Sequence, residues 1–564
     1  MTRQRLLMFG IDAATLDLVR PWVARGELPA LGRLIEGGVV GPLRSVPNMI
    51  TPAAWTSFAT GCNPAKHGIF YFTERIPGTY DERFIKGASR AIPPFWMLLS
   101  RSGVTCTVVN VPMTFPADPV SGVMVSGMDA PGVDTPGYTH PPGLAADLKR
   151  RFTNRLGSDS GPGGIGHLML AGSLDAALDA LTEKVRARTD LARYLIEQYP
   201  SDLFALVHTE VDDVQHYFWA YMDPRVPGPT RAQRMRYADS ILRLYREVDR
   251  SLEALQDAFG PSLVLVLSDH GAGASPGVED GLPWIHLVLE ELGLSAHQTD
   301  RGLLHRTSRR TAVALYRSLN PRLPHPVRRL LRRWTPTALN TVKATMQYHL
   351  DWARTRAFCR GAAGDLWINV RGREPEGIVE PGAEYDRIRA LIREEFLALR
   401  EASSGEPIVE VVQYREEVYE GPFVDRAPDL LIRFRDLVLS GVVMRGKVLR
   451  LPRQAAARPK DVKSGSHRPE GLLIMGGPGV RGRVDLAGAA LVDIAPTTLF
   501  VMGHPVPSYM DGRILTEAFT PECLAASRVE EMTLTPDGGG PREMDYTDEE
   551  SAVLTERLRG LGYI

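Results

Sequence analysis

The segment LVLVLSDHGAG, at residues 263–273, joins an apolar run to a polar pair and a glycine-rich turn. Its first five residues are apolar on both faces of an extended chain, which is typical of a strand inside a sheet covered on both sides. Asp269 and His270 follow this run directly, where burying them without partners would be costly. The glycines after them let adjacent side chains approach one centre. The segment therefore predicts a buried strand that ends in a functional site.

Apolar runs of the same kind recur along the chain, at residues 6–11, 105–111, 203–207, 366–370, 430–432 and 472–475. Segments of helical period lie between them, at residues 175–198, 231–258, 386–400 and 490–502. Buried strands that alternate with helices predict an α/β fold, in which one central sheet is sandwiched between helical layers. In such sheets the functional residues gather where the strands end.

The composition fits a large folded protein, because 44% of its 564 residues are hydrophobic and 24% are charged. The 66 basic and 67 acidic side chains nearly balance, so nucleic acid is not expected as a partner. The four cysteines show no pairing pattern, which suggests a reducing compartment. No stretch is long and apolar enough for a signal peptide or a transmembrane segment. We therefore expect a cytoplasmic protein.

A basic segment interrupts the pattern, since residues 301–350 hold ten Arg, one Lys and no Asp or Glu. Such a run is typical of a solvated surface, but it also fits a lid that attracts an anionic substrate or an amphipathic helix on a membrane. We interpret residues 296–350 as a basic cap inserted into a catalytic domain of residues 1–520. Residues 521–564 are predicted to form a linker and a terminal helix, capped by Thr547 and Glu550.

Residues suited to binding metal follow other apolar runs. Asp12 follows the first run, and Asp212 and His216 follow the third, four residues apart and so on one face of a helical turn. His467 lies just before the last run. Taken singly, such residues more often cap helices or form surface pairs. Together with Asp269 and His270, they supply the carboxylates and imidazoles that a two-metal site for phosphate esters needs.

A nucleophile is predicted in the segment NMITPAAWTSFATGCNPAKHGIFYF, at residues 48–72. Thr51 precedes a helical stretch, so its hydroxyl would lie at a helix N-terminus, which favours the negative charge of an alkoxide or a phosphoryl group. A threonine hydroxyl is too weakly acidic to attack unaided, but metal coordination can deprotonate it. A role as helix cap is the structural alternative.

These motifs together resemble the alkaline phosphatase superfamily, and within it the type I phosphodiesterase and nucleotide pyrophosphatase family. In that family the nucleophilic Thr lies nine residues before the Thr of a TG dipeptide, and a P-x-x-H-G motif follows. Thr51, Thr60 and residues 64–68 reproduce this spacing here. The early Asp and the D-x-x-x-H, D-H-G and G-x-H motifs of the family match at Asp12 and at residues 212–216, 269–271 and 465–467.

The resemblance implies a metal-dependent hydrolase in which Thr51 attacks phosphorus and forms a phosphothreonine intermediate. It assigns two sets of ligands, namely Asp12, Thr51, Asp269 and His270 for one divalent cation, and Asp212, His216 and His467 for the other. Zinc suits this mixture of imidazole and carboxylate, with manganese or iron as alternatives. The substrate would be a small phosphate monoester or diester, and the motifs do not distinguish the two. They predict no oligomeric state.

One position departs from the family pattern. Nucleotide pyrophosphatases carry an Asn twenty-one residues after the nucleophile, where it binds a phosphoryl oxygen, and this chain has Phe72 there. Loss of that amide donor leaves the nucleotide-diester assignment open. Two other function classes also remain. A phosphotransferase or phosphomutase would pass the phosphoryl group to an alcohol, and a non-catalytic relative would bind metal without turnover.

Overall fold

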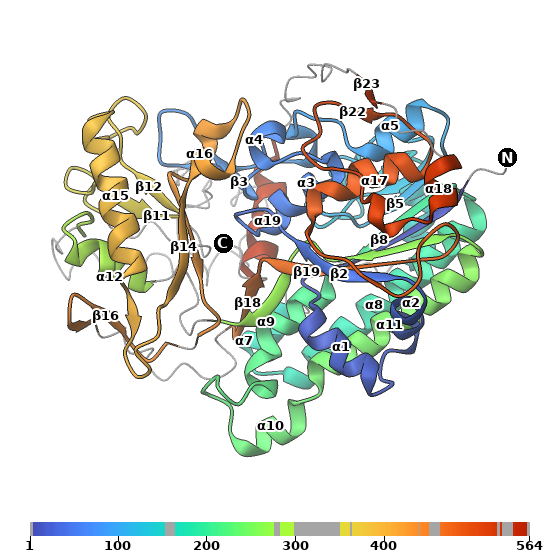
Figure 1. Ribbon diagram of the computed structural model, residues 1–564, viewed down its shortest axis with the longest axis horizontal. Helices are drawn as coiled ribbons and strands as arrows, with labels where there is room; N and C mark the ends of the chain where they lie inside the picture. The colour runs from blue at the N-terminus through green and yellow to red at the C-terminus, as the bar shows by residue number, and fades with distance from the viewer. Residues whose placement is uncertain are drawn as a thin grey trace, which may run out of the picture.

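The computed structural model describes residues 4–152, 164–275, 283–297, 350–360, 364–437, 439–449, 463–526, 531–532 and 545–560. The chain forms a larger and a smaller lobe, and the smaller one lies at the left of Figure 1. The predicted basic cap at residues 296–350 lies almost wholly outside the described residues. No helix in the described ranges is long and apolar enough to cross a membrane.

The larger lobe is built on a ten-stranded mixed sheet. In spatial order its strands are β20 (Val484–Asp485), β2 (Val39–Arg44), β19 (Glu470–Gly476), β9 (Leu263–Leu267), β1 (Leu6–Ile11), β8 (Leu203–His208), β5 (Cys106–Val109), β6 (Gly122–Val125) and β7 (Thr139–His140), and β21 (Ala489–Ala490) pairs with β2. From β9 to β6 all neighbours are parallel, whereas β19 and β7 run antiparallel to theirs. The carboxyl ends of β9, β1 and β8 therefore meet at one edge.

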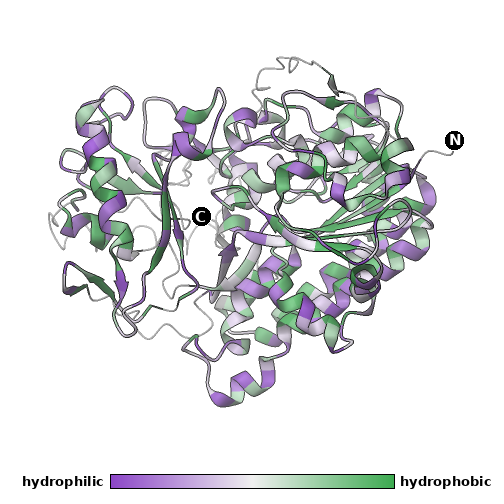
Figure 2. Ribbon diagram, in the orientation of Figure 1, coloured by the Kyte–Doolittle hydropathy of each residue, from purple (hydrophilic) through white to green (hydrophobic). Residues whose placement is uncertain are grey.

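Helices cover both faces of this sheet. One face carries α1 (Leu16–Ala24), α2 (Pro29–Gly37), α8 (Leu174–Gln198), α9 (Glu210–Met222) and α11 (Ser240–Phe259). The other carries α3 (Thr51–Thr60), α5 (Phe95–Arg101) and α17 (Ile494–Val501). In β1 the side chains alternate between the two cores, with Phe9 and Ile11 in the first and Leu6 and Met8 in the second. Figure 2 shows the central strands as hydrophobic, in agreement with burial on both faces.

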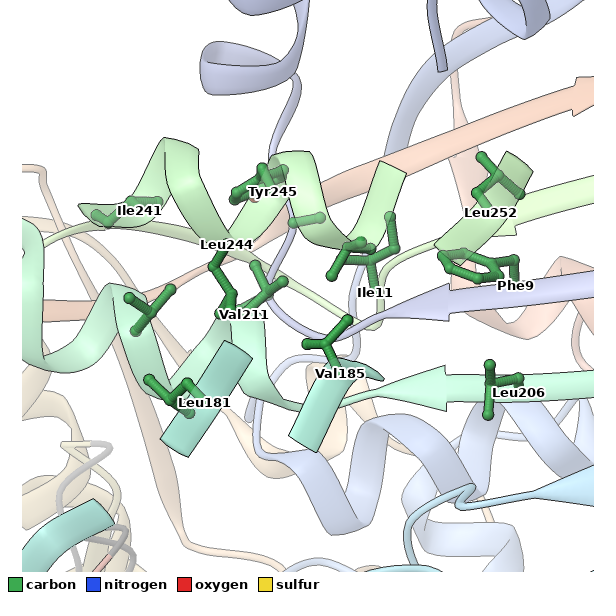
Figure 3. Close-up of a cluster of buried hydrophobic side chains, with 14 of the residues drawn as sticks. Phe9, Ile11, Leu181, Val185, Leu206, Val211, Ile241, Leu244, Tyr245 and Leu252 are labelled. Carbon is green, nitrogen blue, oxygen red and sulfur yellow. The ribbon is translucent and has the colours of Figure 1, made fainter. Parts of the chain in front are cut away.

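Figure 3 shows the core on the face covered by α8, α9 and α11. Phe9 and Leu206 of the sheet lie among Val185, Val211 and Tyr245 from the three helices. Each such side chain contributes roughly 1.5–3 kcal/mol when it is fully buried. The predicted α/β fold, with a central sheet between helical layers, is confirmed.

The smaller lobe is formed by the chain between β10 (Gly271–Ala274) and β18 (Gly465–Arg468), which pair with each other. Its four-stranded antiparallel sheet has the order β11 (Ala357–Cys359), β12 (Leu366–Ile368), β15 (Leu430–Phe434) and β14 (Val409–Tyr414), and α12 (Pro283–Glu291) and α15 (Ala383–Leu397) pack with it. The prediction of one sheet was wrong for the runs at 366–370 and 430–432, which belong to this second sheet. A short apolar run predicts a strand, but its pairing depends on distant residues.

The remaining helices and strands are short or peripheral. Among the described residues, the remaining α-helices and strands are α4 (Pro64–His67), β3 (Thr73–Arg75), β4 (Glu82–Phe84), α6 (Leu144–Phe152), α7 (Ile165–Leu170), α10 (Arg231–Tyr237), β13 (Arg400–Glu401), α16 (Arg415–Val418), β16 (Val442–Met444), β17 (Lys447–Leu449), β22 (Val506–Pro507), α18 (Pro521–Ala526), β23 (Glu531–Met532) and α19 (Asp548–Gly560).

The hairpin of β3 and β4 links the larger lobe to the smaller one. At its turn, Tyr80 stacks on Trp352 with ring centroids 3.8 Å apart, and its hydroxyl donates to Asn369 Oδ1 at 2.8 Å. Arg75 of β3 pairs with the buried Glu374. These contacts hold the smaller lobe against the segment that follows the predicted nucleophile.

The C-terminal helix α19 docks on the larger lobe. Its start has the predicted cap, because Thr547 N donates to Glu550 Oε2 at 2.8 Å and Glu550 N donates to Thr547 Oγ1 at 3.2 Å. Leu554 and Leu558 pack in a cluster with Phe72. The helix therefore packs against the end of the predicted nucleophile segment, residues 48–72.

We expect Leu554→Asp to release α19 while the rest of the protein stays folded, because a carboxylate has no partner in that apolar cluster. Limited proteolysis should then cut within residues 545–560 faster than in the wild type. Thr555→Ala is the control, and we expect it to leave the cleavage rate nearly unchanged. Equal resistance of Leu554→Asp and wild type would contradict this packing role.

Candidate active site

Six of the seven predicted metal ligands, all except Thr51, come together at the edge where β8, β1 and β9 end. Asp12 follows β1, and Asp269 and His270 follow β9. Asp212 and His216 lie one turn apart on α9, which begins soon after β8, as their spacing predicts. The sixth ligand, His467, lies on β18. Parallel pairing of the three strands thus gathers residues far apart in the sequence.

Asp12, Asp269 and His270 form the first cluster, and each is at most 1% exposed. His270 Nε2 lies 3.3 Å from Asp269 Oδ2 and 3.6 Å from Asp12 Oδ1. Among the described residues these three atoms have no hydrogen-bond partner. The other carboxylate oxygens are held, since Trp55 Nε1 donates to Asp12 Oδ2 at 3.0 Å and Ala13 N to Asp269 Oδ1 at 3.3 Å. The cluster therefore presents three buried, unsatisfied ligand atoms.

Asp212, His216 and His467 form the second cluster. His216 Nε2 lies 3.2 Å from Asp212 Oδ1 and 3.1 Å from His467 Nε2, and His467 Nε2 lies 3.5 Å from Asp212 Oδ1. The two clusters adjoin, because the rings of His270 and His467 stack with centroids 3.8 Å apart. Ligand atoms of Asp12, Asp212 and His270 also lie within 4.8 Å of one another.

Backbone carbonyls fix the proton on each imidazole. The rings of His216, His467 and His270 donate from Nδ1 to the carbonyls of Gly465, Met49 and Gly271, at 2.8, 2.7 and 3.1 Å. Burial and the neighbouring His270 lower the pKa of His467 to about 3, so its ring is neutral. A neutral ring that donates from Nδ1 has a lone pair on Nε2. In both His216 and His467 the Nδ1 atom is thus engaged by a carbonyl and Nε2 is the atom that faces the cluster, as in metal-binding imidazoles.

The electrostatics of the site are compatible with bound cations. Burial raises the pKa of Asp12 well above its usual range, and the carboxylates of Asp269 and Asp212 raise it further. Burial likewise raises the pKa of Asp269 to about 8. Within the described ranges, no Lys or Arg side chain pairs with Asp12 or Asp269. Buried carboxylates are stable as anions only beside positive charge, so this donor set fits divalent metal.

Thr51 is buried and is the first residue of α3, as predicted. Two contacts hold this end of the helix against the clusters. Two residues before Thr51, the carbonyl of Met49 accepts from His467 Nδ1 at 2.7 Å. One turn after Thr51, on the same helix face, Trp55 donates to Asp12. The chain on either side of Thr51 is therefore held by one ligand of each cluster.

The contacts made by Trp55 and Met49 were not predicted from the sequence. The four-residue spacing from Thr51 to Trp55 was a usable signal for a shared face. The role of a backbone carbonyl, such as that of Met49, cannot be predicted from the sequence because every residue has one. Both Met49 and Ala13, which follows Asp12, have positive φ, at 31° and 61°. Strain of this kind concentrates at functional sites.

Phe72 does not supply the donor that nucleotide pyrophosphatases have at its position. It is buried in an apolar cluster with Ile69, Met113 and Tyr546. Its side chain therefore packs in this apolar cluster and offers no hydrogen-bond donor to a phosphoryl oxygen.

A family model described as type I phosphodiesterase / nucleotide pyrophosphatase matches residues 6–439. A search of curated proteins gives no match.

Among solved structures, the phosphonoacetate hydrolase of Sinorhizobium meliloti 1021 in complex with phosphonoacetate has a TM-score of 0.50 and 15% identity, over 89% of this chain and 95% of that one. Human ectonucleotide pyrophosphatase / phosphodiesterase 5 has a TM-score of 0.45 and 12% identity, over 91% and 98%. An inactive form of the murine protein of that name, in complex with AMP, has a TM-score of 0.43 and 11% identity, over 88% and 95%. At 15% identity, the likeness to the first structure concerns the fold alone.

Gly465→Ala tests the second cluster without removing a ligand. A Cβ at residue 465 would lie 2.3 Å from Gln215 O, so β18 must move away from α9 and carry His467 from Asp212. We expect the variant to lose one of two bound cations in elemental analysis. Gly143→Ala is the control, because nothing lies within 4 Å of its added Cβ. Two cations retained in both variants would contradict the assignment of His467.

The metal-free protein should become less stable as the pH rises. The pKa of Asp269 is about 8 in the folded protein and 3.8 as its ordinary value, so between these values the folded protein holds a proton that the unfolded chain has lost. Stability therefore falls with rising pH across this window. We expect a lower Tm at pH 8 than at pH 5.5, a smaller difference in Asp269→Asn, and a gain in Tm at pH 8 on adding zinc. A Tm that rises with pH in metal-free wild type would argue against the buried carboxylic acid.

Proposed function

The chain belongs to the type I phosphodiesterase / nucleotide pyrophosphatase family, and on that premise we propose that it hydrolyses a small phosphate ester through a phosphothreonine at Thr51. Membership of this family makes it a phosphoric ester hydrolase. The observation that carries the proposal is the position of Thr51, whose helix is tied to Asp12 by Trp55 and whose preceding loop is tied to His467.

Two divalent cations would be held by these residues. Asp12, Thr51, Asp269 and His270 would hold one, and Asp212, His216 and His467 the other. Zinc is our proposal for both, because neutral imidazoles and carboxylates are its ordinary ligands, while manganese or iron accepts the same set. When bound, the cations supply positive charge that lowers the pKa of the Thr51 hydroxyl and neutralises the phosphoryl oxygens and the leaving oxygen.

The residues of the chain then carry out a double displacement. Thr51 Oγ1 loses its proton to solvent and forms a bond to phosphorus, while the bond to the leaving alcohol oxygen breaks. The N-terminus of α3 favours the negative phosphoryl group beside it. Water next attacks phosphothreonine and releases phosphate, or a monoester when the substrate is a diester, and Thr51 is regenerated. Trp55 keeps Asp12 in place during both steps.

Phosphate monoesters and phosphate diesters are both candidate substrates. With Phe72 in place of the amide of nucleotide pyrophosphatases, we propose that the phosphoryl group is bound by the cations and the α3 N-terminus. The smaller lobe stands over the segment that follows α3 and would contact the organic part of the substrate.

Thr51→Ala should lower turnover by at least about 10³, the scale seen when a nucleophile is removed. The assay compares p-nitrophenyl phosphate, bis-p-nitrophenyl phosphate and phosphonoacetate with zinc-loaded wild type and variant. Thr51→Ser keeps a hydroxyl and should retain measurable activity. Equal turnover in wild type and Thr51→Ala would refute the nucleophile.

The same assay separates hydrolysis from the alternatives. Release of inorganic phosphate in the presence of added alcohols supports hydrolysis, whereas a phosphorylated alcohol as the main product would identify a phosphotransferase. Bound cations without any turnover of these three compounds would favour a non-catalytic relative.

A further inference from the structure

A segment of the smaller lobe packs directly on the residues that follow the nucleophile helix. Phe423 N donates to the carbonyl of Ala65 at 2.9 Å, and Asn63 Nδ2 donates to the carbonyl of Glu420 at 2.9 Å. Between them, Gly421 approaches so closely that an added Cβ would lie 2.5 Å from Ala65 O. The smaller lobe is therefore in direct backbone contact with the loop around α4.

From this segment, Tyr419 reaches the loop that precedes Thr51. Its hydroxyl donates to Asn48 Oδ1 at 3.0 Å, and Asn48 Nδ2 donates to the carbonyl of Phe70 at 2.8 Å. The rings of Phe70 and Tyr419 meet edge to face with centroids 5.4 Å apart. Tyr419 and Asn48 are 4% and 3% exposed, so water does not compete for these bonds. Both ends of the Asn48 amide are thus held.

The residue after Asn48 has an unfavourable backbone conformation. Met49 has φ 31°, a region that residues other than glycine rarely adopt, and its carbonyl accepts from His467. A strained residue keeps its conformation only when its surroundings fix it on several sides. Two contacts hold Met49 here, namely the hydrogen bond from His467 to its carbonyl and the bond between Tyr419 and the preceding residue, Asn48. Thr51 follows Met49 by two residues, so its position depends on both.

We propose that Tyr419 of the smaller lobe is a positioning residue that holds the Thr51 loop in its reactive geometry through Asn48. The proposal rests on the role of Thr51 as nucleophile. Through Tyr419, the smaller lobe would then contribute to catalysis in addition to contacting the substrate. Misplacement of a reacting group by about 1 Å can cost 10²-fold in rate, so one hydroxyl at this point has a kinetic effect.

Tyr419→Phe removes the hydroxyl and keeps the ring packed on Phe70. We expect kcat to fall by about 10- to 100-fold, with KM nearly unchanged and two zinc ions retained. Asn48→Ala should lower kcat to a similar degree, and the double variant should be little worse than either single one, because both act through one contact. Unchanged kcat in Tyr419→Phe, or a loss of kcat that only follows a loss of zinc, would overturn the proposal.

Tyr385→Phe is the matched control. The Tyr385 hydroxyl donates to Asp429 Oδ1 at 2.7 Å within the smaller lobe, away from the Thr51 loop. We expect this variant to lose Tm like Tyr419→Phe but to keep wild-type kcat. A fall in kcat equal to that of Tyr419→Phe would show that general weakening of the lobe suffices, and it would overturn a specific role for Tyr419.

A readout that is independent of activity separates this inference from the proposed function. Amide hydrogen exchange of a peptide covering residues 46–58 should be faster in Tyr419→Phe than in wild type and Tyr385→Phe. Faster exchange together with full activity in Thr51→Ala would leave the contact standing and refute the nucleophile. Exchange that is the same in all three proteins would refute the contact itself.

Discussion

Three carboxylates at the edge of a hydrophobic sheet constrain the whole site. Asp12, Asp212 and Asp269 are buried beside one another, and burial favours the neutral form of Asp12 and Asp269. A bound cation would favour their ionised form instead. The Nε2 atoms of His216, His270 and His467 lie beside these carboxylates, since each ring donates from Nδ1 to a backbone carbonyl. The carboxylates and imidazoles gathered at the strand ends are therefore a suitable set of ligands for cations.

The sequence was a good guide where the signal was local. The apolar run at residues 263–267 became β9, and Thr51 became the first residue of α3. The family motifs also identified the candidate ligands in their order along the chain. The parallel pairing of β8, β1 and β9 explains how these ligands come close together in space. Zinc as the metal and a cytoplasmic location stay predictions, because neither follows from the positions of residues.

The failures concern contacts between distant segments. The runs at 366–370 and 430–432 looked like further strands of the central sheet but built a second one, because strand partners depend on long-range packing. The carbonyl of Met49 and the hydroxyl of Tyr419 could not be foreseen either. A carbonyl is present in every residue, and a lone tyrosine in a lobe without recognised motifs carries no signal. The basic cap at residues 296–350 lies outside the described residues.

The order of the strands also has a consequence for synthesis of the chain. Leu6 of β1 pairs with Leu203 on one side and Leu263 on the other, so the middle of the sheet closes only after much of the chain exists. His467, the last of the ligands in the sequence, is synthesised later still. A topology of such high contact order folds slowly, and β1 does not have both of its partner strands until residues 203–267 have been made. Until that closure, β1 is an apolar segment that is prone to aggregation.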